Sequence, residues 1–142
     1  MGASHAVISL GDLSRSSFDD EYFRDAGITW PEGLEGARNP TPRELRRVLR
    51  SLGGYNVEYD ATGHSLDVTI SNSMDAQDWA VIWVENYVGL ASEDQPLPLS
   101  FHRGNEPLVL RLMSEMARVC GPFLVVFNFE DPRLVTADGP AR

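Results

Sequence analysis

Hydrophobic and polar residues alternate with a period of two in the middle of the chain. The alternation runs through "YNVEYD" (residues 55–60) and "SLDVTIS" (residues 65–71). Successive side chains of a strand point to opposite faces of a sheet, so this pattern predicts two half-buried strands. The intervening "ATGH" contains turn residues, and the pair is therefore predicted to be a β-hairpin.

Three further segments have the character of strands. "WAVIWVENYV" (residues 79–88) is apolar on both sides, and "LPLSF" (residues 97–101) alternates again. Four consecutive strands of this kind predict an antiparallel meander. "FLVVFNF" (residues 123–129) is a continuous apolar run, which predicts one buried strand near the C-terminus.

Two segments instead repeat apolar residues every three or four positions, as amphipathic helices do. In the first, Thr41 and Glu44 have the spacing of a capping box, and Gly53 can end the helix. The second covers residues 106–120 and stops at Gly121. Together the elements predict an α+β fold with a mainly antiparallel sheet, made of a four-strand meander plus a C-terminal strand. The two amphipathic helices pack on one face of that sheet.

The length of 142 residues predicts a single domain over 1–142. Residues 1–41 are a loosely patterned lead-in, with "AVISL" as a short strand and "FDDEYFRDA" (residues 18–26) as a short helix. Residues 137–142, rich in glycine and proline, are expected to be a disordered tail.

The net charge of the chain indicates which classes of partner to expect. The 21 acidic residues outnumber the 12 basic ones and give a net charge of −9. Because nucleic acids and anionic membranes are bound by positive surfaces, we expect neither as a partner, and a basic protein partner fits better. No secretion signal or membrane-spanning apolar run is present, and the absence of lysine is typical of a GC-rich genome, so a bacterial, cytoplasmic protein is expected.

Arginines gather on one helix despite the acidic composition. They are Arg43, Arg46, Arg47 and Arg50, which lie opposite the apolar stripe of the first helix. This arginine stripe is either a solvated helix face or a docking site for an acidic segment such as residues 19–35.

No sequence motif of a known catalytic class is present, so we expect no enzyme, no cofactor and no metal. His5, His64 and His102 lack metal-ligand spacing, and Cys120 lies on an apolar helix face that favours an inert buried thiol. An anion site is one interpretation of the segment before the second helix, formed by His102, Arg103 and Gly104. The alternative is that Asn105 or Glu106 caps the helix and Arg103 is solvated.

The meander offers the strongest candidate for a binding surface. If its aliphatic side faces the helices, large aromatics and carboxylates share the other side: Trp79, Trp83, Tyr87, Glu58, Asp67 and Glu85. Tryptophan and tyrosine are common anchors of protein interfaces, and carboxylates select basic partners. Alternatively, residues 1–41 fold over this face and bury the aromatics in a second small core.

These features predict a non-enzymatic protein-binding module, such as an inhibitor or immunity-type protein that neutralises a basic nuclease toxin. Aromatic platforms beside carboxylates also suit carbohydrate binding or glycoside hydrolysis, with Glu58, Asp67 or Glu85 as acid and base. A third hypothesis is a homo-oligomeric scaffold in which the aromatic face packs against a second copy. The sequence alone favours no particular oligomeric state.

Overall fold

The protein is described here by a computed structural model that covers residues 4–12, 27–28, 36–85, 94–128 and 131–140. The strands are β1 (His5–Ser9), β2 (Tyr55–Thr62), β3 (Ser65–Asn72), β4 (Asp75–Val84), β5 (Ser100–Gly104), β6 (Phe123–Phe127), β7 (Asp131–Thr136) and β8 (Gly139–Pro140). The helices are a 3₁₀ turn η1 (Leu10–Asp12), α3 (Pro42–Arg50) and α4 (Glu106–Cys120). The helix expected at residues 18–26 lies outside the described residues.

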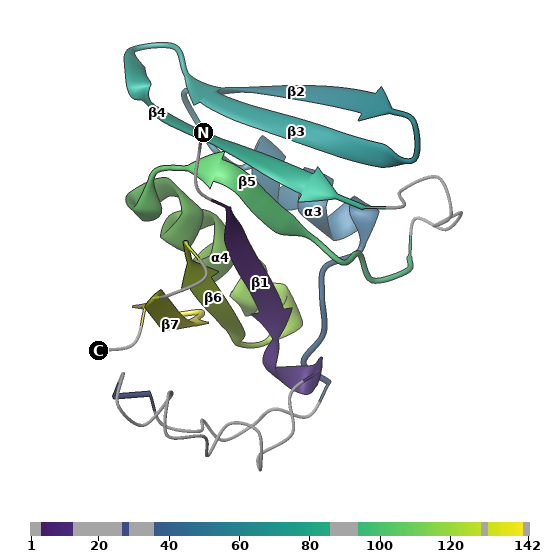
Figure 1. Cartoon of the computed structure of the whole chain (residues 1–142), viewed down its shortest axis with the longest axis vertical. Helices are drawn as coiled ribbons and strands as arrows, with labels where there is room; N and C mark the ends of the chain where they lie inside the picture. The colour runs from purple at the N-terminus through teal and green to yellow at the C-terminus, as the bar shows by residue number, and fades with distance from the viewer. Residues whose placement is uncertain (1–3, 13–26, 29–35, 86–93, 129–130, 141–142) are drawn as a thin grey trace.

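The strands form one antiparallel sheet in the order β2-β3-β4-β5-β1-β6-β7-β8 (Figure 1). The predicted α+β class is confirmed, and β2 to β5 form the expected meander. The sheet is larger than predicted, because β1, β7 and β8 also belong to it. The expected lead-in thus contains a central strand, and β8 lies within the segment that we expected to be a disordered tail.

The short strand predicted at "AVISL" is confirmed as β1, but its central place in the sheet was not predicted, and polar residues occupy two of its core-facing positions. His5 and Ser9 are both buried. Nδ1 of His5 accepts a hydrogen bond from the Asn128 backbone N–H at 3.2 Å, and its Nε2 lies 3.3 Å from the Gly104 carbonyl oxygen. A neutral imidazole protonated on Nε2 satisfies both contacts. A buried polar side chain is tolerated here because the rest of the fold supplies its partners.

Helices α3 and α4 cover the same face of the sheet, behind it in the view of Figure 1. The main core lies between these layers. Its fully buried members include Val68, Ile70, Ile82, Phe101, Leu112, Met113, Met116, Phe123 and Phe127. The apolar stripes predicted for the two helices are the surfaces that they bury. No helix in the described part of the chain combines the length and apolar character needed to cross a membrane.

The opposite, outer face of the sheet has two different halves. Over β1, β6 and β7 it carries a second apolar cluster in which Leu10, Leu124 and Leu134 are buried, with Ile8, Ile28 and Val126 packed around them. Over β2 to β5 the outer face is polar and aromatic. The sheet therefore has apolar contacts on both faces at one end and on one face at the other.

The predicted capping box at the start of α3 is present in both of its halves. The Thr41 hydroxyl accepts from the Glu44 backbone N–H at 3.2 Å, and the Glu44 carboxylate accepts from the Thr41 N–H at 3.0 Å. Arg38 adds a bidentate ion pair to the same carboxylate, with N–O distances of 2.6 and 2.8 Å. These donors, and above all the guanidinium, lower the pKa of Glu44 from 4.5 to about 2. Glu44 therefore fixes both the helix start and the preceding loop.

Replacing Glu44 with Gln should lower the free energy of unfolding by about 2 kcal/mol at neutral pH, since Arg38 is partly exposed and water weakens the pair. A carboxyl group with a depressed pKa stabilises the fold above its unfolded value of 4.5 and loses this effect as the pH falls toward 2. Urea titrations should show the difference from wild type shrinking across that range. Glu115→Gln is the control, because its ion pair with Arg118 is long, at 3.8 Å, and exposed. A pH-independent loss in Glu44→Gln would contradict the account.

Cys120 is buried at the end of α4, as predicted. Burial, with a further contribution from the negative charge of Glu44, raises the pKa of its thiol to about 11. The reactive thiolate is thus a very small fraction at neutral pH. Ellman's reagent should modify Cys120 slowly in the native protein and at an ordinary thiol rate in urea, and rapid native labelling would contradict the assignment.

Candidate functional site

The polar half of the outer sheet face brings together most of the predicted partner-binding residues. We call it the acidic–aromatic face and define it by Glu58, Asp60, Asp67, Trp79, Val81, Trp83 and His102. The register places Asp67 directly opposite Trp83 and Thr69 opposite Val81, while Ala80, Ile82 and Val84 point into the core. Trp79, Val81 and Trp83 are only partly buried. The described residues therefore leave these aromatics partly accessible on the face opposite the helices.

Trp83 is held in place by a stacking partner. The rings of Trp83 and His102 lie 4.8 Å apart between centroids, with an interplanar angle of 28°. The contact depends on an irregularity of β5: Ile82 pairs with Phe101 and Val81 with Arg103, so His102 is an extra residue in that strand. Such a bulge re-aims side chains locally, and here it allows His102 to reach Trp83.

Gly104 closes the bulge where side chains of β4 and α4 approach its backbone closely. A Cβ atom at this position would lie 2.8 Å from the Cβ of Ala80 and 3.0 Å from a methyl group of Val109. Only glycine fits between β4 and α4 at this distance. The bulge and the start of α4 are therefore positioned by the same residue.

Asp67 brings an unsatisfied acceptor to the face. Its Oδ1 is buried and, among the described residues, receives no hydrogen bond. Asp60 lies directly opposite it on β2, which adds a second carboxylate nearby. A buried acceptor without a hydrogen bond lowers the stability of the fold. Asp60 and Asp67 together make this point of the face acidic.

The remaining predicted residues lie around the same area. Glu58 is exposed on β2, on the side of Asp60, and Glu85 is exposed just after β4. Glu85 and Trp83 line a shallow hollow of about 190 Å³ together with Pro98, Leu99 and Ser100. Tyr87 lies outside the described residues. The structure thus brings together five of the six predicted partner-binding residues at one end of the sheet.

The segment proposed as an anion site has a different local role. Asn105 caps α4, since its side-chain oxygen accepts from the Leu108 N–H at 2.8 Å, as the capping alternative predicted. His102 stacks on Trp83, and Arg103 is exposed. No observation here tests anion binding by His102, Arg103 and Gly104, which stays a prediction. The described residues contain no group of three or more potential metal ligands.

Sequence reasoning missed a polar junction centred on Asp78. Its carboxylate accepts hydrogen bonds from the Tyr55 hydroxyl, from Asn72 Nδ2 at 3.1 Å and from Asn105 Nδ2 at 3.0 Å. The hydrogen bond from Tyr55 is the main cause of the lowered pKa of Asp78, and the same bond raises the pKa of Tyr55.

The junction joins β2, β3 and β4 to the N-terminus of α4. It borders an open hollow of about 400 Å³, and Arg111 lies 5.9 Å above the Tyr55 ring on its rim. Because three donors occupy the Asp78 carboxylate, it is poorly suited to act as a general base, and we assign it a structural role. The only sequence signal for it was the capping position of Asn105.

The arginine stripe is mainly a solvated surface in the described structure. Arg43, Arg47 and Arg50 are exposed, and Arg43 forms an exposed ion pair with Asp94 at 3.3 Å. Arg46 is half-buried beside an apolar hollow. Most of the acidic segment 19–35 lies outside the described residues, so its docking on the stripe stays a prediction.

No protein-family model matches the chain, and comparisons with curated proteins and with solved structures find no match either.

Proposed function

We propose that this protein is a non-enzymatic binding module that holds a basic protein partner on the acidic–aromatic face, in the manner of an inhibitor or immunity protein. The observation that carries the proposal is the position of Trp79 and Trp83, partly exposed on the side of the sheet away from the helices. Large aromatics that already have part of their surface packed lose little entropy on binding and make effective interface anchors.

The charge of the face supports a basic partner. Glu58, Asp60, Asp67 and Glu85 surround the aromatics, and in the described structure Arg103 is the cation of the neighbouring strand. With a net charge of −9 on the whole chain, long-range attraction would speed the encounter with a basic protein. The exposed carboxylates of Glu58 and Glu85 are well suited to guanidinium donors from that partner.

The shape of the face favours a protein over a small sugar ligand. The hollow beside Trp83 measures about 190 Å³, whereas pockets for drug-sized ligands measure about 300–1,000 Å³. A shallow surface with anchors at its centre is typical of protein interfaces. We place the activity in the cytoplasm, where a reduced thiol such as Cys120 is stable.

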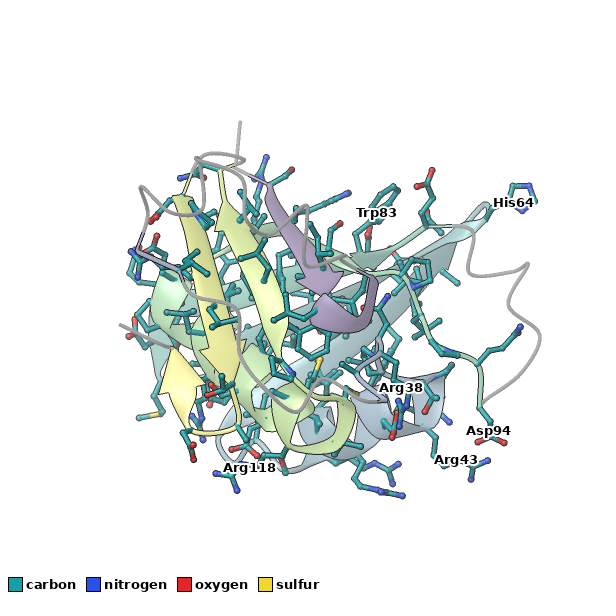
Figure 2. The ribbon with its side chains drawn as sticks, turned by 90° about the horizontal axis from the view of Figure 1, so that it is seen from below. Arg38, Arg43, His64, Trp83, Asp94 and Arg118 are labelled. Carbon is teal, nitrogen blue, oxygen red and sulfur yellow. The ribbon has the colours of Figure 1, made fainter. Side chains whose placement is uncertain are left out.

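The experiment is a comparative capture from a lysate of the source organism, with wild type, Trp83→Ala and Arg118→Gln as baits. Figure 2 shows Trp83 and Arg118 on opposite sides of the molecule, so the second substitution changes charge far from the face. Wild type and Arg118→Gln should retain the same basic protein, and Trp83→Ala should lose it. A protein retained equally by all three baits would contradict the proposal, as would an acidic protein lost with Trp83→Ala.

A further inference from the structure

Strand β2 forms one edge of the sheet. It is eight residues long, lies at the end of the strand order and, within the described part of the chain, pairs with β3 alone. An edge strand of this length presents backbone N–H and C=O groups that another strand can pair with. In Figure 1 it lies along the outer border of the sheet, above β3.

The hairpin turn determines which backbone groups point outward. Gly63 and His64 form a two-residue loop between the paired residues Thr62 and Ser65. Gly63 has a φ of +61°, and His64 is not among the residues with positive φ, as in a type II′ turn. The pair that closes such a loop is hydrogen bonded, and the pattern then alternates along the strand. The backbone groups of Val57 and Ala61 are therefore directed away from β3, and those of Glu58 toward it.

An apolar groove runs beside this edge on the helix side. It has a volume of about 300 Å³ and is lined by Pro42, Leu45, Arg46, Tyr59, Ala61, Leu66 and Leu97. Tyr59 is one of the most exposed large hydrophobic residues in the described structure, at 48%. Alternate side chains of a strand added to β2 would lie over this groove, because side chains of neighbouring strands share a face.

The two faces of strand β2 differ in charge, and this difference determines which kind of strand can pair with it. On the outer side Glu58 and Asp60 are exposed, whereas the groove side is apolar and carries Arg46. A complementary strand needs basic residues on one side and aliphatic residues on the other. A second copy of β2 would place Glu58 and Asp60 beside the same carboxylates of its partner, which is unfavourable in an antiparallel pair.

We propose that β2 is a docking edge for an extended segment of the basic partner in which arginine or lysine alternates with aliphatic residues. The segment adds a ninth strand: its aliphatic side chains enter the groove, and its basic side chains lie beside Glu58 and Asp60. This inference rests on the proposed function, since it takes the same partner and names the part of it that binds at the edge of the acidic–aromatic face.

The test uses a defined probe, an acetylated and amidated peptide of four Arg-Val repeats, in fluorescence anisotropy titrations. The control peptide has the same composition in blocks, with two arginines followed by two valines, and therefore the same charge without the alternation. The alternating peptide should bind at least tenfold more tightly than the block peptide. Equal affinities would show attraction by charge alone and would overturn the proposal.

Protein variants separate the edge from the sheet face. Ala61→Arg fills the groove and adds a positive charge, and Ala76→Arg makes the same change at an exposed position of β4 outside the groove. Ala61→Arg should weaken peptide binding at least tenfold, and Ala76→Arg should leave it within twofold. If instead Trp83→Ala abolishes peptide binding and Ala61→Arg does not, the peptide binds the face; the docking edge is then wrong while the proposed function stands.

Amide hydrogen exchange in the wild-type protein gives a readout that needs no variant. Saturation with the alternating peptide should slow exchange of the Val57 and Ala61 amides at least tenfold. The amide of Glu58, already directed toward β3, should change by less than threefold. Uniform protection of the strand, or no protection at Val57 and Ala61, would overturn the proposal.

Discussion

Replacing Phe101 with alanine should lower the free energy of unfolding by about 3–5 kcal/mol. Phe101 is fully buried in the middle of the sheet, opposite Ile82 on one side and His5 on the other. The substitution leaves a cavity beneath the helices at the point where the meander joins β1. Since two neighbouring strands and the helix layer all contact this position, the site can collapse only partly.

The neighbouring residue provides a matched control for this prediction. His102 is exposed and lies on the other side of β5, where it contacts Trp83. His102→Ala should change the free energy of unfolding by less than about 1 kcal/mol, as expected for a surface residue with one ring contact. Denaturant titrations of both variants check the assignment. Similar losses in the two variants would mean that the faces of β5 are assigned wrongly.

The helices could be predicted from the sequence because their signals are local. The boundaries of α4 coincide with the predicted residues 106–120, and the capping box of α3 involves residues only three positions apart. In both helices the apolar period identifies the buried side without knowledge of the partner. Local sequence is sufficient wherever the interacting groups are close along the chain.

The sequence predicts the short strand "AVISL", which overlaps β1, but it does not indicate where this strand lies in the sheet. Its neighbours, β5 and β6, lie about a hundred residues further along the chain, and its buried His5 depends on Asn128 and Gly104. Alone, "HAVIS" has polar residues at both ends and an ambiguous period. Only the tertiary partners make these polar side chains acceptable in the core. The prediction therefore underestimated the sheet and treated its central strand as part of a lead-in.

In the candidate site, too, some features follow from the local sequence and others depend on tertiary contacts. Strict alternation was enough to place Trp79 and Trp83 on the side away from the helices, because β4 pairs with β3 in continuous register from Trp79 to Val84. The stacking of His102 on Trp83 depends on the bulge in β5, which has no clear sequence signal. The Asp78 junction gathers side chains from three strands and a helix cap. Neither could be inferred from spacing along the chain.

Trp83→Ala should weaken the complex with the captured basic partner about 30-fold or more, mainly through faster dissociation. Trp83 is anchored by His102 and lies opposite Asp67, whose Oδ1 receives no hydrogen bond from the described residues. Removal of Trp83 takes away apolar contact area and changes the surroundings of that carboxylate. Surface plasmon resonance on the purified partner gives both rate constants. A lower melting temperature with unchanged rate constants would make Trp83 a purely structural residue.

A variant that removes a charge tests the association rate in the same complex. Glu85→Gln removes an exposed carboxylate at the end of β4 beside Trp83. It should slow association and reduce its dependence on salt, with little effect on dissociation, because exposed charges act mainly on the encounter. If Glu85→Gln instead accelerates dissociation as strongly as Trp83→Ala, the assignment of association to the carboxylate and of dissociation to the tryptophan is wrong.

Hydroxyl-radical footprinting of the complex tests the central claim most directly, because it reports the accessibility of individual side chains in the wild-type protein. Oxidation of Trp79 and Trp83 is measured with and without the purified partner, and Met74, which is 91% exposed in the turn between β3 and β4, serves as the dose reference. We predict at least fivefold slower oxidation of Trp83 in the complex, with Trp79 also protected. Unchanged oxidation of both tryptophans at saturating partner would show that binding takes place elsewhere on the molecule.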